Sequence, residues 1–424
     1  MSIEQLLAHV QIPKMIKVRQ NFPRPVLMDV GKTVREAMQR PEIIGRIKCG
    51  DKIAITAGSR GITNIALILR EVVDTLKAIG AEPFIIPTMG SHGGAAVQGQ
   101  VEVLHSLGIS EESMGVPIRA TMDVVQVGIS DGGIPVYFDK YAAEADATVV
   151  VGRIKPHTSF RGAYESGLAK MVAIGLGKQK GAEICHATGP EKMSQRIADI
   201  AQTSIEKTNV LFALGIIENG FEETCKIVAL SKDEIMRQEP ELLQEARANL
   251  PQIPFAKYDV LIVDEIGKNI SGLGMDTNII HRFPTLAIQF EPSVQRIVVL
   301  DLTAETRGNV HGLGLADVCT KRVFDKIDYR KTYPNPLTSR LPEASKIPMV
   351  MQSDRLAIQA AIQTCYDLDY TKIRMIRITN TLRLDELLIS EHLLDQARSD
   401  PSLEIVGDAE PMVFNESGDL RRDF

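Results

Sequence analysis

Short β-branched runs alternate with helical runs along the chain, and this alternation limits the fold more than any other feature of the sequence. Residues 52–56 (KIAIT) predict a strand, residues 62–79 a helix, and residues 83–87 (PFIIP) the next strand. Two strands joined through a covering helix run parallel, because the crossover returns the chain to the same end of the sheet. The sequence therefore predicts an α/β fold with mainly parallel sheets.

The alternation continues along the chain but breaks once, near residue 250. Strands are predicted at residues 147–151 and 210–216, with a helix after Gly189. Pro251 and Pro254 then interrupt the pattern. A second series of strands follows the break, at residues 258–263, 296–300 and 373–378.

A chain of 424 residues is longer than one hydrophobic core usually organises. We therefore expect two α/β domains, residues 1–250 and 251–424, with an active-site cleft between them. The end of the chain lacks a clear periodicity, and we expect a tail there that returns over the first domain.

Composition and charge exclude several classes of protein. The 48 basic and 54 acidic residues give a net charge of −6, so nucleic acid is not an expected partner. No uninterrupted apolar stretch approaches the ~18 residues of a membrane span, and the N-terminus lacks a signal-peptide pattern. The five scattered cysteines argue against a disulfide framework. We expect a cytoplasmic protein with no membrane partner.

Three loops that follow predicted strands carry side chains suited to chemistry. In parallel sheets such loops converge at one edge, where ligands bind. His92 lies among glycines too small to bury it, and Pro156 restrains the backbone before His157, so these two histidines are candidate acid and base groups. Arg60 is suited to binding a carboxylate, although an exposed loop arginine explains it equally well.

A glycine-rich segment, residues 153–189, brings His157, Lys170 and His186 into one stretch. A neutral lysine amine can bond to a carbonyl-type carbon, and a neutral imidazole can bind nickel or a proton. The combination suggests an anchored cofactor. The spacing also fits a surface lysine, a histidine at a helix end and simple turns.

Four motifs in this region occur in a particular order. They are Gly90–Gly93 around His92, the Pro156-His157 pair, the run Ser166-Gly167-x-x-Lys170, and His186 after Ile184-Cys185. By these motifs the chain resembles the nickel-pincer-nucleotide-dependent lactate racemase superfamily of 2-hydroxyacid racemases and epimerases.

The resemblance implies a role for each matched residue. Lys170 would anchor the pyridinium-3-thioamide-5-thiocarboxylic acid mononucleotide, Gly167 would belong to the same cofactor-binding run, and His186 would complete the square plane of nickel. His92 and His157 would act as alternate acid and base, and Arg60 would assist binding.

The implied reaction inverts a 2-hydroxy acid by moving a hydride to the cofactor and back to the other face of a flat keto acid. Its partners would be the small hydroxy acid and, transiently, the enzymes that synthesise the cofactor. A homo-oligomer is compatible with this interpretation.

The chain also departs from the pattern of the family. Residues 57–61 read AGSRG where the family has D-x-x-R-P, so the acidic residue near Arg60 is missing. The stretch from His157 to Ser166 is slightly longer than in lactate racemases, and it contains Arg161. A different substrate is therefore expected, with Arg161 and, in the second domain, Lys268 as candidate substrate-binding residues.

Two further functions remain open from the sequence. A nicotinamide-dependent (NAD) oxidoreductase would use GLGKQKG, residues 175–181, to bind phosphate. A noncatalytic protein would bind nickel or the nucleotide and leave hydroxy acids unchanged.

Overall fold

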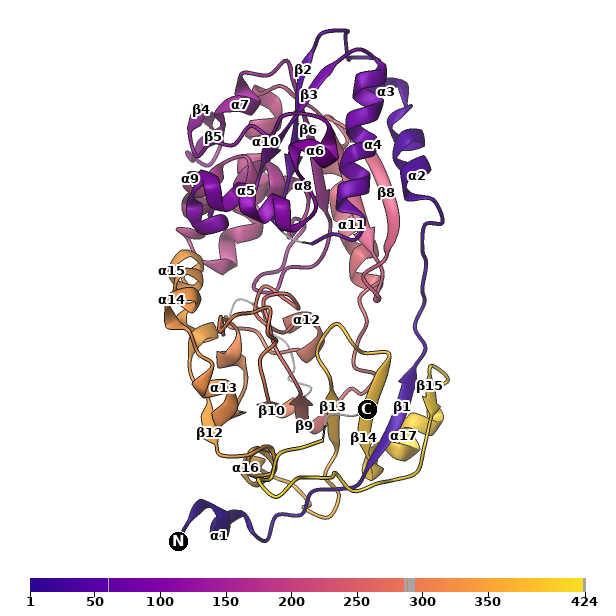
Figure 1. Ribbon diagram of the computed structural model, residues 1–424, viewed down its shortest axis with the longest axis vertical. Coiled ribbons are helices and arrows are strands. Elements are labelled where there is room, and N and C mark those ends of the chain that lie inside the picture. Colours follow the sequence, from indigo (N-terminus) through magenta and orange to yellow (C-terminus); the bar gives the residue numbers. More distant parts are fainter. Residues whose placement is uncertain (60, 286–287, 289–293, 422–424) are drawn as a thin grey trace. The chain divides into compact units, whose positions relative to one another are not determined.

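The chain forms two compact units in a computed structural model that describes residues 1–59, 61–285, 288 and 294–421 (Figure 1). The larger unit contains residues 24–250, and the split unit combines residues 1–23 with residues 251–424. Each unit is built around its own sheet and is described by itself.

The sheet of the larger unit has five strands in the order β3-β2-β6-β7-β8. The first four strands are parallel and β8 is antiparallel to β7, so the predicted α/β fold with mainly parallel strands is confirmed here. A separate hairpin, β4–β5, has only two strands. The strands are β2 (Lys52–Ala57), β3 (Glu82–Pro87), β4 (Val124–Ile129), β5 (Pro135–Asp139), β6 (Ala147–Arg153), β7 (Val210–Glu218) and β8 (Thr224–Ser231).

Helices cover both faces of this sheet, which explains why its strands are almost entirely apolar. One core packs β-strand side chains against α2 and α4, and the other packs them against the helices that follow β6 and β8. The helices of the larger unit are α2 (Val30–Met38), α3 (Pro41–Ile44), α4 (Ile65–Ala78), α5 (Val97–Ser106), α6 (Glu111–Met114), α7 (Lys140–Ala143), α8 (Leu168–Lys170), α9 (Lys178–His186), α10 (Met193–Lys207) and α11 (Ile235–Ala248).

The split unit has an eight-stranded sheet in the order β12-β11-β10-β9-β13-β14-β1-β15. The five strands from β12 to β13 are parallel, and β14, β1 and β15 continue the sheet in antiparallel pairs. The strands are β1 (Met15–Gln20), β9 (Tyr258–Val263), β10 (Val294–Val299), β11 (Val318–Thr320), β12 (Met349–Met351), β13 (Met375–Ile378), β14 (Glu386–Ser390) and β15 (Leu403–Ile405). The helices are α1 (Ile3–Leu7), α12 (Thr277–Ile280), α13 (Lys321–Asp325), α14 (Tyr329–Thr332), α15 (Pro334–Ser339), α16 (Asp354–Thr364) and α17 (Leu394–Ser399).

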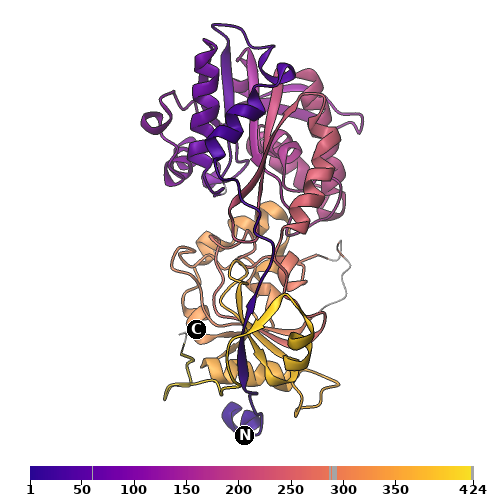
Figure 2. The same cartoon turned by 90° about the vertical axis from the view of Figure 1, so that its right-hand side faces the viewer.

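The first residues of the chain belong to the split unit, whereas the sequence had placed them in a first domain of residues 1–250. β1 pairs with β14 on one side and β15 on the other, and Figure 2 shows this indigo strand beside yellow strands from the other end of the chain. A single strand carries no local signal for the sheet that it will join, so periodicity could not reveal this pairing.

The tail, which the sequence had predicted to return over the first domain, pairs with strands and helices of the split unit. The backbone N–H of Met15 donates to the carbonyl of Glu410, and that of Arg355 donates to the carbonyl of Gly418. Leu420 donates its backbone N–H to the Asp354 carboxylate at 2.9 Å. These contacts fix the tail against the strand and helix that it crosses.

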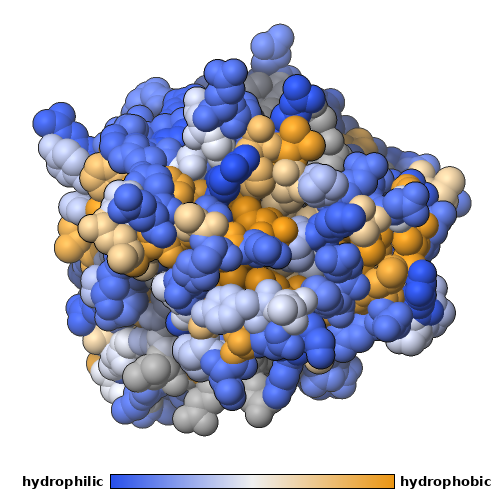
Figure 3. All heavy atoms as spheres, turned by 90° about the horizontal axis from the view of Figure 1, so that it is seen from below, coloured by the Kyte–Doolittle hydropathy of each residue, from blue (hydrophilic) through white to orange (hydrophobic). Residues whose placement is uncertain are grey.

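The surface of the protein mixes apolar and polar side chains. On the face shown in Figure 3, apolar side chains reach the surface in separate patches among polar ones. Within the described ranges, no helix combines the length and the apolar character needed to cross a membrane.

Shortening Val18 tests the position of β1. Val18 is fully buried between Leu387 and Ile405, so Val18→Ala should lower the free energy of unfolding by about 2 kcal/mol in urea denaturation. Arg19→Ala is the matched control, because the exposed ion pairs of Arg19 contribute at most about 1 kcal/mol. Equal effects of the two substitutions would contradict the placement.

Candidate active site

Three loops of the larger unit leave the sheet at the same edge. β2 pairs in parallel with both β3 and β6, so the carboxyl ends of these strands lie side by side. The loops that follow carry Ser59, His92 and His157 respectively. The topology therefore brings together the strand ends from which the sequence predicted an active site.

A helical segment packs against these three loops and carries the other candidate groups. Residues 171–175 continue α8 as a π-helical turn, and α9 follows. A Cβ atom on Gly58 would lie 3.1 Å from Cε of Met171, and one on Gly90 would lie 3.0 Å from Cγ2 of Ile174. The two glycines thus let the loops approach the segment that holds Lys170 and His186.

His157 lies near several basic side chains. Burial lowers the pKa of its imidazole well below 6.5, and the nearby charges of Lys170, His186, Lys155 and Arg161 lower it further, in that order. Its side chain nevertheless keeps partial access to solvent. His157 is therefore a neutral ring at neutral pH, surrounded by four groups that can carry positive charge.

Hydrogen bonding determines which nitrogen of His157 carries the proton. The backbone N–H of Ser159 donates to Nδ1 at 3.0 Å, so the proton of the neutral ring resides on Nε2. The ring also stacks on Phe160, with a centroid separation of 4.1 Å. The neutral ring consequently presents an N–H donor at its free nitrogen.

A buried carboxylate organises the loop that carries His157. Glu165 accepts the backbone N–H of His157 at 2.6 Å and that of Gly162 at 3.1 Å. It also accepts a hydrogen bond from Arg247 of α11 at 2.8 Å, and Arg161 lies 3.5 Å from it. Burial raises the pKa of Glu165, although these donors oppose the shift. The loop is thus folded around one carboxylate.

Arg161 takes part in the same loop. Its Nη1 donates to the carbonyl oxygens of His157 at 2.6 Å and Phe160 at 3.1 Å. The guanidinium therefore stabilises the backbone on which His157 is placed, in addition to its charge near the ring. Its predicted contact with substrate stays a prediction.

His92 is held by side chains from two elements. Its Nδ1 is hydrogen-bonded to the hydroxyl of Ser59, which follows β2. The buried amide of Gln100 in α5 donates to the carbonyl of Gly90 at 3.0 Å and to that of His92 at 3.3 Å. Because a hydroxyl can donate or accept, His92 can carry its proton on either ring nitrogen.

Another buried carboxylate, that of Glu239 in α11, holds the start of the helix that carries Lys170. The backbone N–H of Ala169 donates to Glu239 Oε2 at 2.7 Å. A Cβ atom on Gly167 would lie only 2.1 Å from Glu239 Oε1. Position 167 therefore requires glycine because the carboxylate occupies the space of a side chain.

The first of the two lysines in the GLGKQKG run, Lys178, has a structural role. Its ammonium group is fully buried, lies 2.8 Å from Asp139 Oδ2, and donates to the carbonyl of Pro87 at the end of β3. A Cβ atom on Gly177 or Gly181 would lie 2.5 or 2.7 Å from the Ala173 carbonyl oxygen. These glycines permit close helix packing, so the run does not form the open phosphate loop that an oxidoreductase would need.

The two other predicted residues are Arg60 and Lys268. Arg60 falls outside the described residues; nearby, the N–H of Thr63 donates to Glu218 at 2.6 Å. Lys268 belongs to the split unit, where its Nζ donates to the carbonyl of Gly272 at 2.6 Å. Its role in binding substrate stays a prediction.

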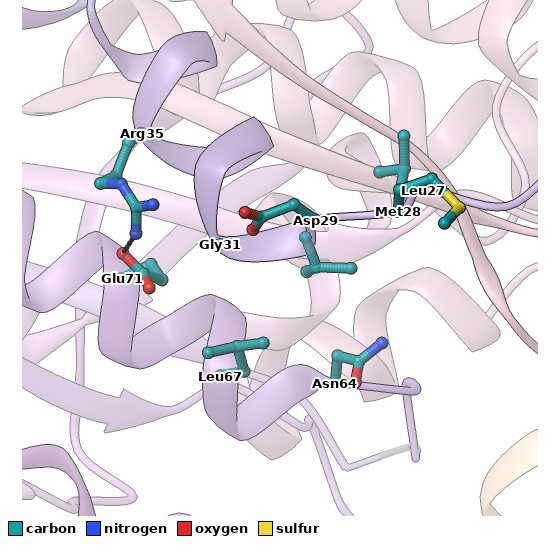
Figure 4. A pocket seen from close by; sticks show the side chains of 9 residues that line it. Leu27, Met28, Asp29, Gly31, Arg35, Asn64, Leu67 and Glu71 are labelled. Atoms are coloured by element: carbon teal, nitrogen blue, oxygen red, sulfur yellow. Dashed lines mark hydrogen bonds and ion pairs between the residues drawn. The ribbon is translucent and has the colours of Figure 1, made fainter.

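A surface pocket of about 440 Å³ lies between α2 and α4 (Figure 4). Arg35 and Glu71 form an ion pair of 2.5 Å across it, and Asp29 uses its carboxylate to cap α2. None of the predicted site residues lines this pocket. These polar side chains form an ion pair and a helix cap, so we assign the pocket no part in the chemistry.

The basic side chains near His157 would attract a ligand that carries negative charge. Within the part of the chain that the structure describes, no three His, Cys, Asp or Glu side chains are grouped to hold a metal ion. A metal bound at His186 would thus take its remaining ligands from a bound molecule. Anionic groups on that molecule would offset the repulsion among Lys155, Lys170, Arg161 and His186.

Sequence reasoning did not identify several residues that shape the site. Lys155, two positions before His157, could have been noticed from its proximity in sequence. Ser59, Glu165, Glu239 and Lys178 could not, because their contacts join elements that lie far apart in sequence or depend on burial.

Comparison with known proteins identifies relatives of the larger unit and of the fold. Residues 8–197 match the sequence family described as lactate racemase N-terminal domain. The fold is similar to that of the lactate racemase apoprotein from Thermoanaerobacterium thermosaccharolyticum, with a TM-score of 0.53 and 14% identity, covering 87% of this chain and 99% of that one. No curated protein sequence matches the chain.

The protonation state of His157 is open to measurement by NMR. We expect a neutral ring with the proton on Nε2 at pH 6, because burial and four basic neighbours disfavour the imidazolium form. Because the pKa of His157 is lower in the folded protein than in the unfolded chain, the unfolded chain binds the proton first. The free energy of unfolding should therefore fall as the pH drops below 6.5. Nitrogen chemical shifts of an imidazolium ring at pH 6 would contradict this assignment.

Removing the charge of Lys178 should destabilise the larger unit. Lys178→Met leaves the Asp139 carboxylate buried without its partner, which should lower the free energy of unfolding by roughly 3–5 kcal/mol. The double variant Lys178→Met with Asp139→Asn should recover much of this loss. Lys180→Met is the control, since Lys180 is exposed and contacts only the face of Tyr137 among the interactions described. An equally small effect of both lysine substitutions would contradict the buried pair.

Proposed function

We propose that the chain is an isomerase that racemises or epimerises a 2-hydroxy acid, a proposal supported by the match of residues 8–197 to the lactate racemase N-terminal domain. The observation that carries the proposal is the group of basic side chains, including Lys170 and His186, around the neutral ring of His157. A 2-hydroxy acid is anionic, and its inversion requires groups that handle a hydroxyl proton. The site supplies both kinds of group.

His157 and His92 are the proposed acid and base. With its proton on Nε2, neutral His157 can donate a hydrogen bond to a substrate oxygen. In the tautomer whose Nδ1 donates to Ser59, Nε2 of His92 is unprotonated and can accept the proton of a substrate hydroxyl. The two histidines exchange these roles for the opposite enantiomer, which requires His157 to give up its hydrogen bond from Ser159.

Lys170 and His186 are the residues that would hold a nickel-pincer nucleotide. Lys170 offers an amine for covalent attachment, and His186 offers one imidazole nitrogen to nickel. When bound, this group supplies a reversible hydride acceptor for the α-carbon of the substrate. The protein then positions the substrate, handles the hydroxyl proton and excludes water.

The substrate is proposed to be a hydroxy acid other than lactate, or one used in addition to lactate. The loop around Glu165 contains the stretch that is longer than in lactate racemases, and Arg161 places a charge close to His157. Arg161 and Lys268 are the proposed substrate-binding residues, and Arg60 is proposed to assist binding of the cofactor. Tight packing at Gly177 and Gly181 gives no support to the oxidoreductase alternative.

The proposal is tested on protein produced together with the enzymes that synthesise the cofactor. Intact mass and nickel analysis should show an adduct and near-stoichiometric metal in the wild type. The adduct should be absent in Lys170→Ala, nickel should fall in His186→Ala, and both should persist in the control Lys180→Ala. A wild type without adduct and nickel would overturn the assigned cofactor.

Activity separates an isomerase from a noncatalytic binding protein. The loaded wild type should interconvert the enantiomers of at least one member of a panel of 2-hydroxy acids. His157→Asn should keep its nickel and lose a factor of roughly 10²–10⁴ in rate. Loaded protein that leaves every enantiomer unchanged would favour the noncatalytic function.

A further inference from the structure

Helix α11 holds the segment from His157 to Lys170 through three contacts from one side. The hydroxyl of Tyr164 donates to the carbonyl of Met236 at 2.7 Å, and Arg247 donates to Glu165 at 2.8 Å. Between these two contacts, Glu239 accepts the backbone N–H of Ala169 at 2.7 Å. α11 therefore spans the length of the segment, and Glu239 is the contact nearest to Lys170.

The carboxylate of Glu239 serves no evident purpose for the stability of α11 itself. It is 1% exposed, and its Oε1 has no hydrogen-bond partner among the described residues. An isolated buried carboxylate is costly, and burial raises the pKa of Glu239 to about 7. The hydrogen bonds from the backbone N–H groups of Ala169 and Leu168 oppose that shift. Burial raises the pKa of the nearby Tyr164, and the charge of Glu239 raises it further.

The geometry around Glu239 restricts the start of α8. The backbone N–H groups of a first helical turn have no partners within their own helix. Glu239 accepts from this turn, and the missing side chain of Gly167 lets the carboxylate approach. Lys170 is the third residue of α8, so the direction of its side chain follows from the placement of this turn.

We propose that Glu239 is a positioning residue for Lys170: its carboxylate fixes the first turn of α8 and thereby aims the lysine side chain. This inference rests on the proposed role of Lys170 as the cofactor anchor. It adds a residue that is 69 positions away in sequence and that does not touch the proposed ligand.

A thermodynamic cycle tests the contact itself. Gly167→Ala places a methyl group in the space of the carboxylate, and Glu239→Ala removes the acceptor, so each should lower Tm by more than about 5 °C. The double variant should lose clearly less than the sum, because removal of Glu239 makes room for the new methyl group. Additive losses would show that the contact does not exist and would overturn the proposal.

The chemical reactivity of Lys170 tests the positioning. The cofactor-free full chain is labelled with acetic anhydride, and the extent of labelling at Lys170 is measured by peptide mass spectrometry against exposed Lys372. Labelling of Lys170 should rise at least threefold in Glu239→Ala, because the first turn loosens. It should remain near the wild-type value in Glu239→Gln, which keeps an acceptor oxygen, and in Glu241→Ala, an exposed position on the same helix.

These measurements distinguish a failure of the positioning role from a failure of the proposed function. Unchanged labelling of Lys170 in Glu239→Ala at a temperature where the variant is folded would overturn the positioning role. If labelling changes as expected while the wild type never acquires a cofactor, the positioning role stands and the anchor function of Lys170 fails. In loaded preparations, Glu239→Ala should carry at least threefold less adduct than Glu239→Gln, and equal loading would also count against the proposal.

Discussion

Two buried carboxylates hold the segment from His157 to Lys170, most of which lies outside regular secondary structure. A loop placed against a sheet edge has backbone N–H groups that no strand or helix satisfies, and each of these groups is costly to bury without a partner. Glu165 accepts such groups at His157 and Gly162, and Glu239 accepts one at Ala169. The position of every candidate group on this segment depends on these acceptors.

The same acceptors contribute to the electrostatic character of the site. Arg161 and Arg247 both pair with Glu165 and offset its negative charge within the loop. The ring of His157 instead experiences a net positive environment and remains neutral. A site of this kind favours an anionic ligand and a neutral imidazole together, which are the two requirements for chemistry on a hydroxy acid near pH 7.

Buried ion pairing extends this organisation to the neighbouring loops. Lys178 connects the end of β3, the start of α7 and the first residue of α9 through Pro87 and Asp139. The loop that carries His92 and the helix that ends at His186 therefore have a common support. Substitution far from either histidine can consequently shift both.

Much of the fold was predictable because it depends on local patterns. The alternation of apolar strands and amphipathic helices indicated the order of elements, and the strand at residues 258–263 has the bounds that were predicted. Parallel pairing followed from the crossover helices. The assignment of β1 to the split unit did not follow, because it depends on pairing with strands more than 360 residues later in the chain.

The candidate site was also predictable only in part from the sequence. Glycine-histidine loops after strands and the spaced run from Ser166 to His186 are properties of the sequence, and by themselves they determined which residues are the candidates for the chemistry and which family they resemble. Only the tertiary structure decided that His157 is neutral, that Gly167 makes room for Glu239, and that Lys178 is a buried structural cation. Burial and long-range contacts control these properties, and neither is encoded in the spacing of residues along the chain.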